Sequence, residues 1–231
     1  MKSESDIFAV RPFSKRNGLT LSLGGGVSLL LGLSLLLGYP GLFAAGLLLF
    51  SLGAVGLLLG LAKLYEPETS MELTPSGLNY HHRRGSVFVA WDNIHRVDVP
   101  RLTQGMELIE LPYVGIKLKR LNPVLDNISP RLATGLLTEQ RPLLMTAATQ
   151  DEDLQSLEHY LGAEFTPLLV EGDRYRGVLA MFGHRCQTLN AHLGYHLYIP
   201  KDSLDRDSAE FVRLLRQRIA AFSLPAAPGN P

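Results

Sequence analysis

The sequence predicts an α+β membrane protein, in which an N-terminal transmembrane helical hairpin precedes an antiparallel β-roll with an inserted helical segment and a C-terminal amphipathic helix. Three observations lead to this prediction. An apolar stretch between Arg16 and Lys63 is long enough to cross a bilayer twice. Short alternating runs typical of strands follow it, and amphipathic helical patterns dominate the later part of the chain.

The charges of the chain balance. Its 231 residues include 22 Lys and Arg and 22 Asp and Glu, so the formal net charge is zero and no global field attracts nucleic acid. Nucleic acid is therefore not expected as a partner. Cys186 is the one cysteine, which excludes an intramolecular disulfide and the disulfide framework of a small secreted domain.

The apolar stretch between Arg16 and Lys63 contains no Asp, Glu, Lys, Arg or His. Because about 20 helical residues cross a hydrocarbon core, the stretch holds two spans, and the turn residues of 38–41 divide it into 19–37 and 42–62. A signal peptide would explain the first span alone, but the second follows at once. Spans without ionisable groups also argue against transport by this chain alone.

Basic residues flank the two spans and are missing from the turn between them. Lys2, Arg11, Lys15 and Arg16 precede the first span, and Lys63 follows the second. By the positive-inside rule, both termini are expected in the cytoplasm, with residues 1–18 as a cytoplasmic N-terminal segment.

Small residues recur on one face of each span, where they allow helix backbones to approach closely. These candidate packing residues are Gly25, Ser28, Gly32, Gly46, Gly53, Gly56 and Gly60. Packing within the hairpin explains them. The alternative is a homo-oligomer formed through the GxxxG of Gly56 and Gly60, and the sequence leaves both open.

A linker of residues 63–69 leads into a soluble α+β domain, residues 70–224. Its first half alternates between apolar and polar residues, as expected of an antiparallel meander with one buried face. The expected strands are Met71–Thr74, Leu78–His82, Ser86–Ala90, Ile94–Val99, Met106–Glu110 and Tyr113–Lys119.

Helical patterns enter the domain after residue 123. Ser129 and Pro130 form a helix start, with Ser129 as N-cap. The expected elements are a helix to about Gln140, a strand Leu143–Ala147, a helix Asp151–Leu161, a helix Val178–Leu193, a strand Tyr195–Ile199 and a helix Ser208–Phe222. Residues 225–231 are expected to be a disordered tail.

The chain has a weak self-similarity. The shift that lays Leu143 on Leu197 also lays Asp153 on Asp207 and Leu157 on Phe211. A helix-strand-helix unit used twice, at about 129–162 and 178–222, explains this match. Coincidence explains it equally, because capped amphipathic helices after strands are common.

Two groups of residues carry the types needed for metal or nucleophilic chemistry. His184, Cys186, His192 and His196 are potential zinc ligands, but their spacing fits no standard zinc module. We interpret Cys186 as a buried apolar residue and the histidines as lying on a helix surface. Asp202, Asp205 and Asp207 are interpreted as helix-start residues that favour the helix dipole, since the Gly and distal Glu of a calcium loop are missing.

The densest basic run is a candidate lipid-contact site. It consists of His81, His82, Arg83 and Arg84, at the tip of an expected β-hairpin close to the membrane exit. Each cationic side chain near an anionic leaflet contributes about 1 kcal/mol to membrane binding. The alternative interpretation is an ordinary solvated turn.

Two passages resemble the bacterial YcxB-like membrane proteins. They are the block Met71–Val99, with Trp91 and Ile94, and the ending Tyr195–Ile219, with its Ile-Pro-Lys at 199–201. The resemblance implies a two-span inner-membrane protein whose soluble part is a pleckstrin-homology-like β-roll closed by a C-terminal helix. It implies no catalytic residues. The middle, from about Leu121 to Gly194, is longer and more helical than that pattern.

We therefore expect a membrane-anchored, non-enzymatic scaffold or interaction module of the bacterial inner membrane, which needs no cofactor and binds a protein partner or the lipid surface. The alternatives are a Cys/His-dependent enzyme or metal-binding module, and an accessory subunit of a membrane transporter. The sequence has no phosphate loop, nucleotide fingerprint or catalytic triad pattern that would favour an enzyme.

Overall fold

The computed structural model describes residues 7–12, 18–64, 69–104, 107–148 and 166–223, and it has the predicted α+β class. The chain forms two compact units. One unit, Pro12–Glu68, contains the apolar hairpin. The other combines Met1–Arg11 with Thr69–Pro231 and contains the sheets and the remaining helices.

The apolar unit consists of α1 (Gly18–Gly38), the 3-10 turn η3 (Pro40–Leu42) and α2 (Phe43–Leu64). Pro40 lies at the start of η3, where its missing N–H breaks no helical hydrogen bond. Both helices are long and apolar enough to cross a membrane, with mean hydropathies of 1.9 for α1 and 2.4 for the segment Pro40–Leu64. Most of their large apolar side chains face outward.

Glycines spaced seven residues apart line the contact between α1 and α2. They are Gly18, Gly25 and Gly32 on α1, and Gly46, Gly53 and Gly60 on α2, all of them buried. A methyl group at Gly32 would clash with the backbone of Phe50, and one at Gly53 with the backbone of Leu29. A seven-residue period keeps a contact seam aligned along two helices that wrap around each other.

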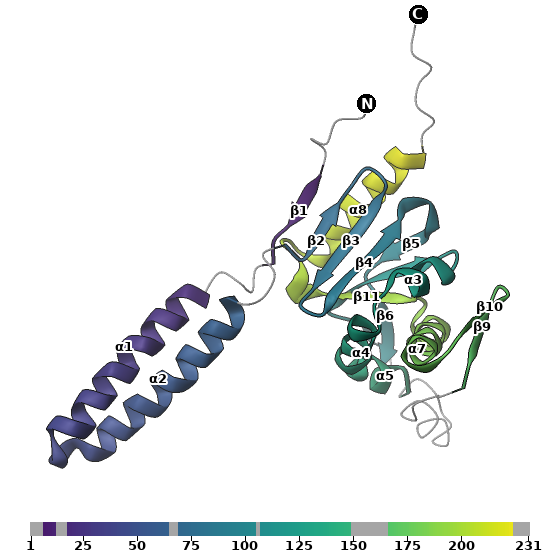
Figure 1. Ribbon diagram of the computed structural model, residues 1–231. Coiled ribbons are helices and arrows are strands. Elements are labelled where there is room, and N and C mark those ends of the chain that lie inside the picture. Colours follow the sequence, from purple (N-terminus) through teal and green to yellow (C-terminus); the bar gives the residue numbers. More distant parts are fainter. Residues whose placement is uncertain (1–6, 13–17, 65–68, 105–106, 149–165, 224–231) are drawn as a thin grey trace, which may run out of the picture. The chain divides into compact units, whose positions relative to one another are not determined.

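A four-stranded antiparallel sheet has the order β1-β2-β3-β4. Its strands are β1 (Phe8–Val10), β2 (Met71–Leu73), β3 (Gly77–His82) and β4 (Gly85–Ala90). Phe8 pairs with Leu73 and Val10 with Met71, so the apolar hairpin is inserted between neighbouring strands (Figure 1). The sequence did not predict β1, because three residues are too few to show alternation.

A second antiparallel sheet has the order β11-β8-β5. It contains β5 (Ile94–Asp98), β8 (Tyr113–Leu118) and β11 (Leu197–Pro200). Two separate ribbons complete the strands: β6 (Arg101–Gln104) with β7 (Glu107–Glu110), and β9 (Leu168–Val170) with β10 (Asp173–Tyr175). The predicted strands of the first half of the domain are therefore present, but they are divided between two sheets and one ribbon.

The helices of this unit are α3 (Asn122–Asn127), α4 (Pro130–Glu139), α5 (Arg141–Ala148), α7 (Gly177–Leu193) and α8 (Ser208–Ser223). Short 3-10 turns, η4 (Trp91–Asn93) and η5 (Lys201–Ser203), lie between strands and helices. Ser129 caps α4 as predicted, since its hydroxyl accepts from Leu132 N, and Gly194 ends α7 with a left-handed φ of 86°. Helix α8 packs against β5, β8 and η4 through the fully buried Phe211 and Leu215 (Figure 1).

The expected strand Leu143–Ala147 is wrong, because these residues belong to helix α5. Leu143, Leu144 and Ala147 are buried, which is a helical and not an alternating pattern, and α5 packs on α7. Residues 129–148, the described part of the first proposed repeat, thus contain two helices and no counterpart of β11. The expected helix Asp151–Leu161 and the tail 225–231 lie outside the described residues.

Candidate functional site

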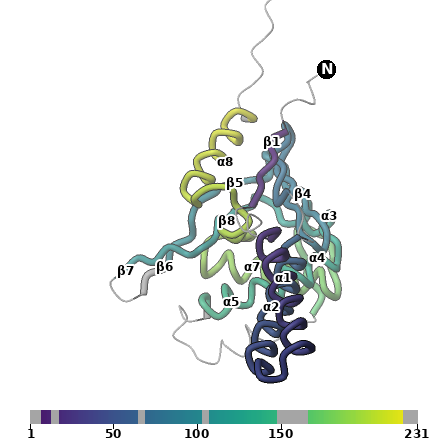
Figure 2. Tube along the Cα trace, turned by 90° about the vertical axis from the view of Figure 1, so that its left-hand side faces the viewer, coloured from purple at the N-terminus to yellow at the C-terminus, as the bar shows by residue number. Residues whose placement is uncertain are grey.

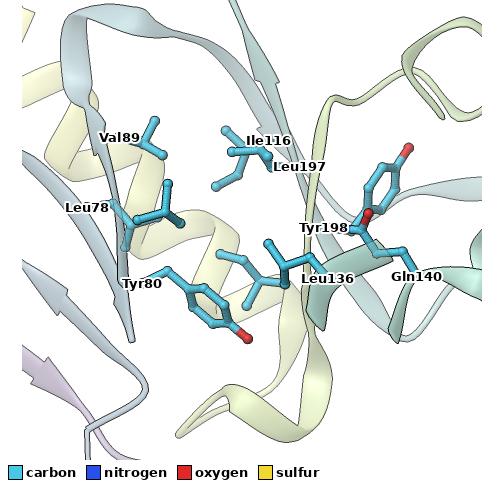
Figure 3. A pocket seen from close by; sticks show the side chains of 10 residues that line it. Leu78, Tyr80, Val89, Ile116, Leu136, Gln140, Leu197 and Tyr198 are labelled. Carbon is cyan, nitrogen blue, oxygen red and sulfur yellow. The ribbon is translucent and has the colours of Figure 1, made fainter. Parts of the chain in front are cut away.

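A small cavity lies between the two sheets and the end of α4. Ten residues line it: Leu78, Tyr80, Val87, Val89, Ile116, Leu136, Gln140, Leu197, Tyr198 and Ile199 (Figure 3). Its volume is about 30 Å³. A benzene-sized guest needs a cavity of about 150 Å³, and one water needs about 10–15 Å³, so the space suits one or two waters and no metabolite.

Gln140 is the unusual residue of this cavity. Its side chain is 3% exposed, and its Oε1 has no hydrogen-bond partner. The neighbouring Tyr198 hydroxyl donates to Leu189 O over 3.3 Å. A buried amide oxygen without a partner costs about 1–3 kcal/mol of stability unless a water satisfies it.

The cysteine and histidines of the candidate metal group lie in different environments. Cys186 is fully buried, and burial raises the pKa of its thiol to about 12, so the thiol is neutral at physiological pH. His184 Nε2 lies 3.3 Å from Thr166 O, and His196 Nδ1 accepts from Leu118 N over 3.1 Å. His192 lies in the last turn of α7. Among the described residues, no three His, Cys, Asp or Glu side chains converge to hold a metal.

Two of the three aspartates before α8, Asp205 and Asp207, are paired with neighbouring groups. Asp205 accepts two hydrogen bonds from Arg206, each of 2.9 Å. Asp207 accepts from Lys201 Nζ at 2.9 Å and from Ala209 N at 3.4 Å, so it sits at the helix start as expected. Lysine and arginine thus supply the positive charge near Asp205 and Asp207.

The candidate lipid-contact run forms the turn between β3 and β4. His81 lies 3.2 Å from Glu72, while His82 and Arg83 lie 3.0 Å and 3.6 Å from Glu139. Arg84 lies along α4 beside Gly135. These carboxylates partly neutralise the run and reduce its attraction for an anionic surface.

The run nevertheless lies at the end of the sheet where the hairpin connects. Met71 pairs with Tyr80, and His81 N donates to Ser70 O over 2.7 Å. The turn that follows His82 is therefore at the same end of the sheet as Val10 and Met71.

The β6–β7 ribbon is a surface that the sequence did not single out. All four residues of β7 are exposed, with Leu108 61% and Ile109 40% exposed. The expected buried face is therefore missing in this strand. At the base of the ribbon, Leu102, Leu111 and Tyr113 pack against a small cluster of α5, α7 and β11 residues, and the ribbon extends away from the sheets (Figure 2).

Compared with models of known protein families, residues 71–221 match the family described as "Protein of unknown function (DUF2982)". The match covers more than half of the chain. The chain belongs to this family. The matched region begins at the first residue of β2 and ends within α8, so it leaves out the apolar hairpin and β1. Neither a curated protein nor a solved structure matches the chain.

Proposed function

We propose that this DUF2982 protein is a membrane-anchored, non-enzymatic interaction module of the bacterial inner membrane, whose soluble unit binds another protein. The observation that carries the proposal is the insertion of the apolar hairpin between β1 and β2. It makes the anchor part of the sheet's own connectivity and gives the soluble unit two attachments to the bilayer.

Strand β1 is firmly held in the sheet. Val10 is fully buried, and its carbonyl accepts from Ser70 N over 2.9 Å. The Ser70 hydroxyl also donates to Ser203 O over 2.5 Å, which links β1 and β2 to η5. The guanidinium of Arg206 lies 5.4 Å from the centre of the Phe8 ring, a cation–π contact.

This pairing supports a hairpin topology in the membrane. Strands on opposite sides of a bilayer cannot pair, so the residues before α1 and after α2 lie on one side. The basic flanks favour the cytoplasmic side. Two short segments, residues 11–17 and 65–70, therefore tether the soluble unit to the hairpin.

The arrangement of the soluble unit favours a pleckstrin-homology-like β-roll, as the YcxB-like resemblance implies. Sheets of four and three antiparallel strands share one core, and α8 covers an end of it with Phe211, Val212 and Leu215. The β6–β7 ribbon and α3–α7 are additions to that plan. Such a fold presents edges and loops to partners.

The potentially reactive side chains of the unit are buried or already hydrogen-bonded, which supports a binding role over a catalytic one. The Cys186 thiol is buried, the His196 imidazole accepts a backbone hydrogen bond, and the sheet cavity suits waters. The β6–β7 ribbon instead exposes the apolar Leu108 and Ile109 between Glu107 and Glu110, a surface suited to contact with a partner.

Crosslinking in intact membranes, followed by mass spectrometry, tests this proposal. A photoreactive amino acid is placed at the exposed Leu108, and for comparison at the exposed Leu169 of the other ribbon. A reproducible protein partner at one or both positions is expected. Crosslinks to lipid and to a second copy alone would overturn the proposal.

A further inference from the structure

The outer edge of β7 has the geometry of an open docking strand. We propose that this edge binds an extended segment of a partner protein, in which apolar residues are flanked by lysine or arginine. This inference rests on the proposed function and names the surface and the chemistry of its partner.

The register of the ribbon decides which backbone groups point outward. Leu111 N donates to Pro100 O over 2.9 Å, which makes this pair a hydrogen-bonded one. Hydrogen-bonded and non-hydrogen-bonded pairs alternate along an antiparallel ladder. Leu102 and Ile109 therefore form a hydrogen-bonded pair, and Thr103 and Leu108 form a non-hydrogen-bonded pair. The N–H and C=O of Leu108 and Glu110 therefore face away from β6. In the described part of the chain, no other strand pairs with β7.

The side chains of β7 give this edge an apolar character. Leu108 and Ile109 are adjacent, so they project to opposite faces of the ribbon, and they are 61% and 40% exposed. A two-stranded ribbon is marginally stable alone in water, and among its described residues this one packs against the rest of the unit at its base. An added strand would cover apolar surface on both faces and satisfy the outward backbone groups.

Charge selects the occupant of this edge. Glu107 and Glu110 flank the apolar pair, and both are exposed. Glu110 also accepts a 2.9 Å hydrogen bond from Arg101 at the ribbon base, and both side chains of this pair remain open to solvent. An anionic lipid surface would repel these carboxylates. In a two-fold dimer through this edge, Leu108 must lie opposite Leu108 or Glu110 of the second copy, because both residues of an antiparallel pair direct their backbone groups the same way. The first register places Glu107 diagonal to its own copy and the second does the same for Glu110, so like charges meet in either case, which is unfavourable. A partner strand with basic flanks complements the edge.

Selection from a phage-displayed random peptide library tests the inference, with the full-length protein held in nanodiscs. We expect enrichment of peptides with β-branched or aromatic residues between lysines or arginines. Doubly substituted protein, Glu107→Lys with Glu110→Lys, should enrich acidic flanks instead. Enrichment without a preference for charge, or no enrichment, would overturn the inference.

A second variant isolates the backbone contribution. Leu108→Pro removes an N–H that faces away from β6, so the ribbon keeps its own hydrogen bonds. Selected peptides should bind this variant at least tenfold more weakly, while the matched variant Leu169→Pro on the exposed β9 should bind them unchanged. Circular dichroism and the melting temperature show whether each variant is folded. Equal binding to Leu108→Pro would exclude strand addition at this edge.

The two proposals fail in different ways. If a photoreactive residue at position 169 captures a protein partner in membranes and Leu108→Pro leaves that capture unchanged, the interaction module stands and the β7 surface is wrong. If crosslinks join β7 of two copies, or β7 and lipid, the basic-strand partner is wrong. If peptides bind β7 as expected but membranes yield no protein partner, the β7 edge stands and the proposed function is wrong.

Discussion

Val10 and Met71 lie opposite each other in one antiparallel ladder, although the whole apolar hairpin separates them along the chain. Both side chains are fully buried in the main core. The short segment before the hairpin is therefore a structural strand of the soluble unit. On the proposed membrane topology, insertion and sheet formation are coupled, because β1 and β2 pair only after both helices have crossed.

Replacing Pro12–Glu68 by Asn-Gly should yield a soluble, folded unit, because Arg11 and Thr69 then join two neighbouring strands through a tight turn. We expect this shortened chain to unfold cooperatively on heating, and circular dichroism recorded at increasing temperature measures the transition. The matched chain that starts at Thr69 lacks β1 and should be less stable by about 2–4 kcal/mol, because it loses the buried Val10 and the contacts of Phe8. Equal stability of the two chains would show that β1 does not pair in solution.

Gly32→Leu should disrupt the hairpin, because a side chain there meets the backbone of α2 at Phe50. The matched change Gly26→Leu, on the same helix, meets nothing within 4 Å and should be tolerated. We expect the first variant to lose at least about 1 kcal/mol of hairpin stability. Proteolysis in membranes or nanodiscs measures this loss. Similar behaviour of the two variants would contradict the glycine seam.

The two glycines of the GxxxG, Gly56 and Gly60, lie in the contact between α1 and α2. A methyl group at Gly60 would clash with Ser22, and Gly56 contacts Gly25, so both glycines contact α1 of their own hairpin. The Ser28 hydroxyl adds a hydrogen bond to Leu49 O of 3.0 Å. Packing within the hairpin accounts for these residues without a second copy.

Gln140→Met should stabilise the soluble unit by about 1–2 kcal/mol, because it removes a buried amide oxygen that has no partner and fills the cavity with an apolar chain. The exposed Gln187, changed to Met, should have an effect near zero. Urea unfolding measures both. A loss of stability in Gln140→Met would mean that an ordered water bonds the amide oxygen.

His196 should make the soluble unit sensitive to acid. Burial, aided by the Lys117 charge, lowers the pKa of its imidazole to about 4 from the ordinary value of 6.5. The unfolded chain therefore binds a proton between these values that the folded chain does not, so stability falls as the pH drops from 6.5 towards 4. Melting temperatures measured across this range should show the fall.

A substitution separates this effect from general acid denaturation. His196→Asn keeps an acceptor for Leu118 N but does not titrate, so it should flatten the dependence of stability on pH in this window. The exposed His95, changed to Asn, should leave that dependence as in the unmodified chain. A steep fall that persists in His196→Asn would assign the acid sensitivity to other groups.

Local patterns were enough to predict much of the chain. About 20 uncharged and mostly apolar residues on each side of a Gly-Tyr-Pro-Gly turn indicate two long apolar helices, because length and hydropathy are properties of the segment itself. The same holds for the Ser129 cap, for the Gly194 stop and for the alternation in β8, whose signals lie within a few residues.

Only the tertiary structure decided the features that depend on distant partners. Phe8–Val10 becomes a strand because Met71–Leu73 offers it an edge, and Leu143–Ala147 becomes a helix because α7 buries one side of it. The open edge of β7 and the unpartnered Gln140 oxygen likewise follow from what lies beside them in space. A sequence specifies the propensity of a segment, but burial and pairing partners far along the chain supply the free energy that selects among the conformations it permits.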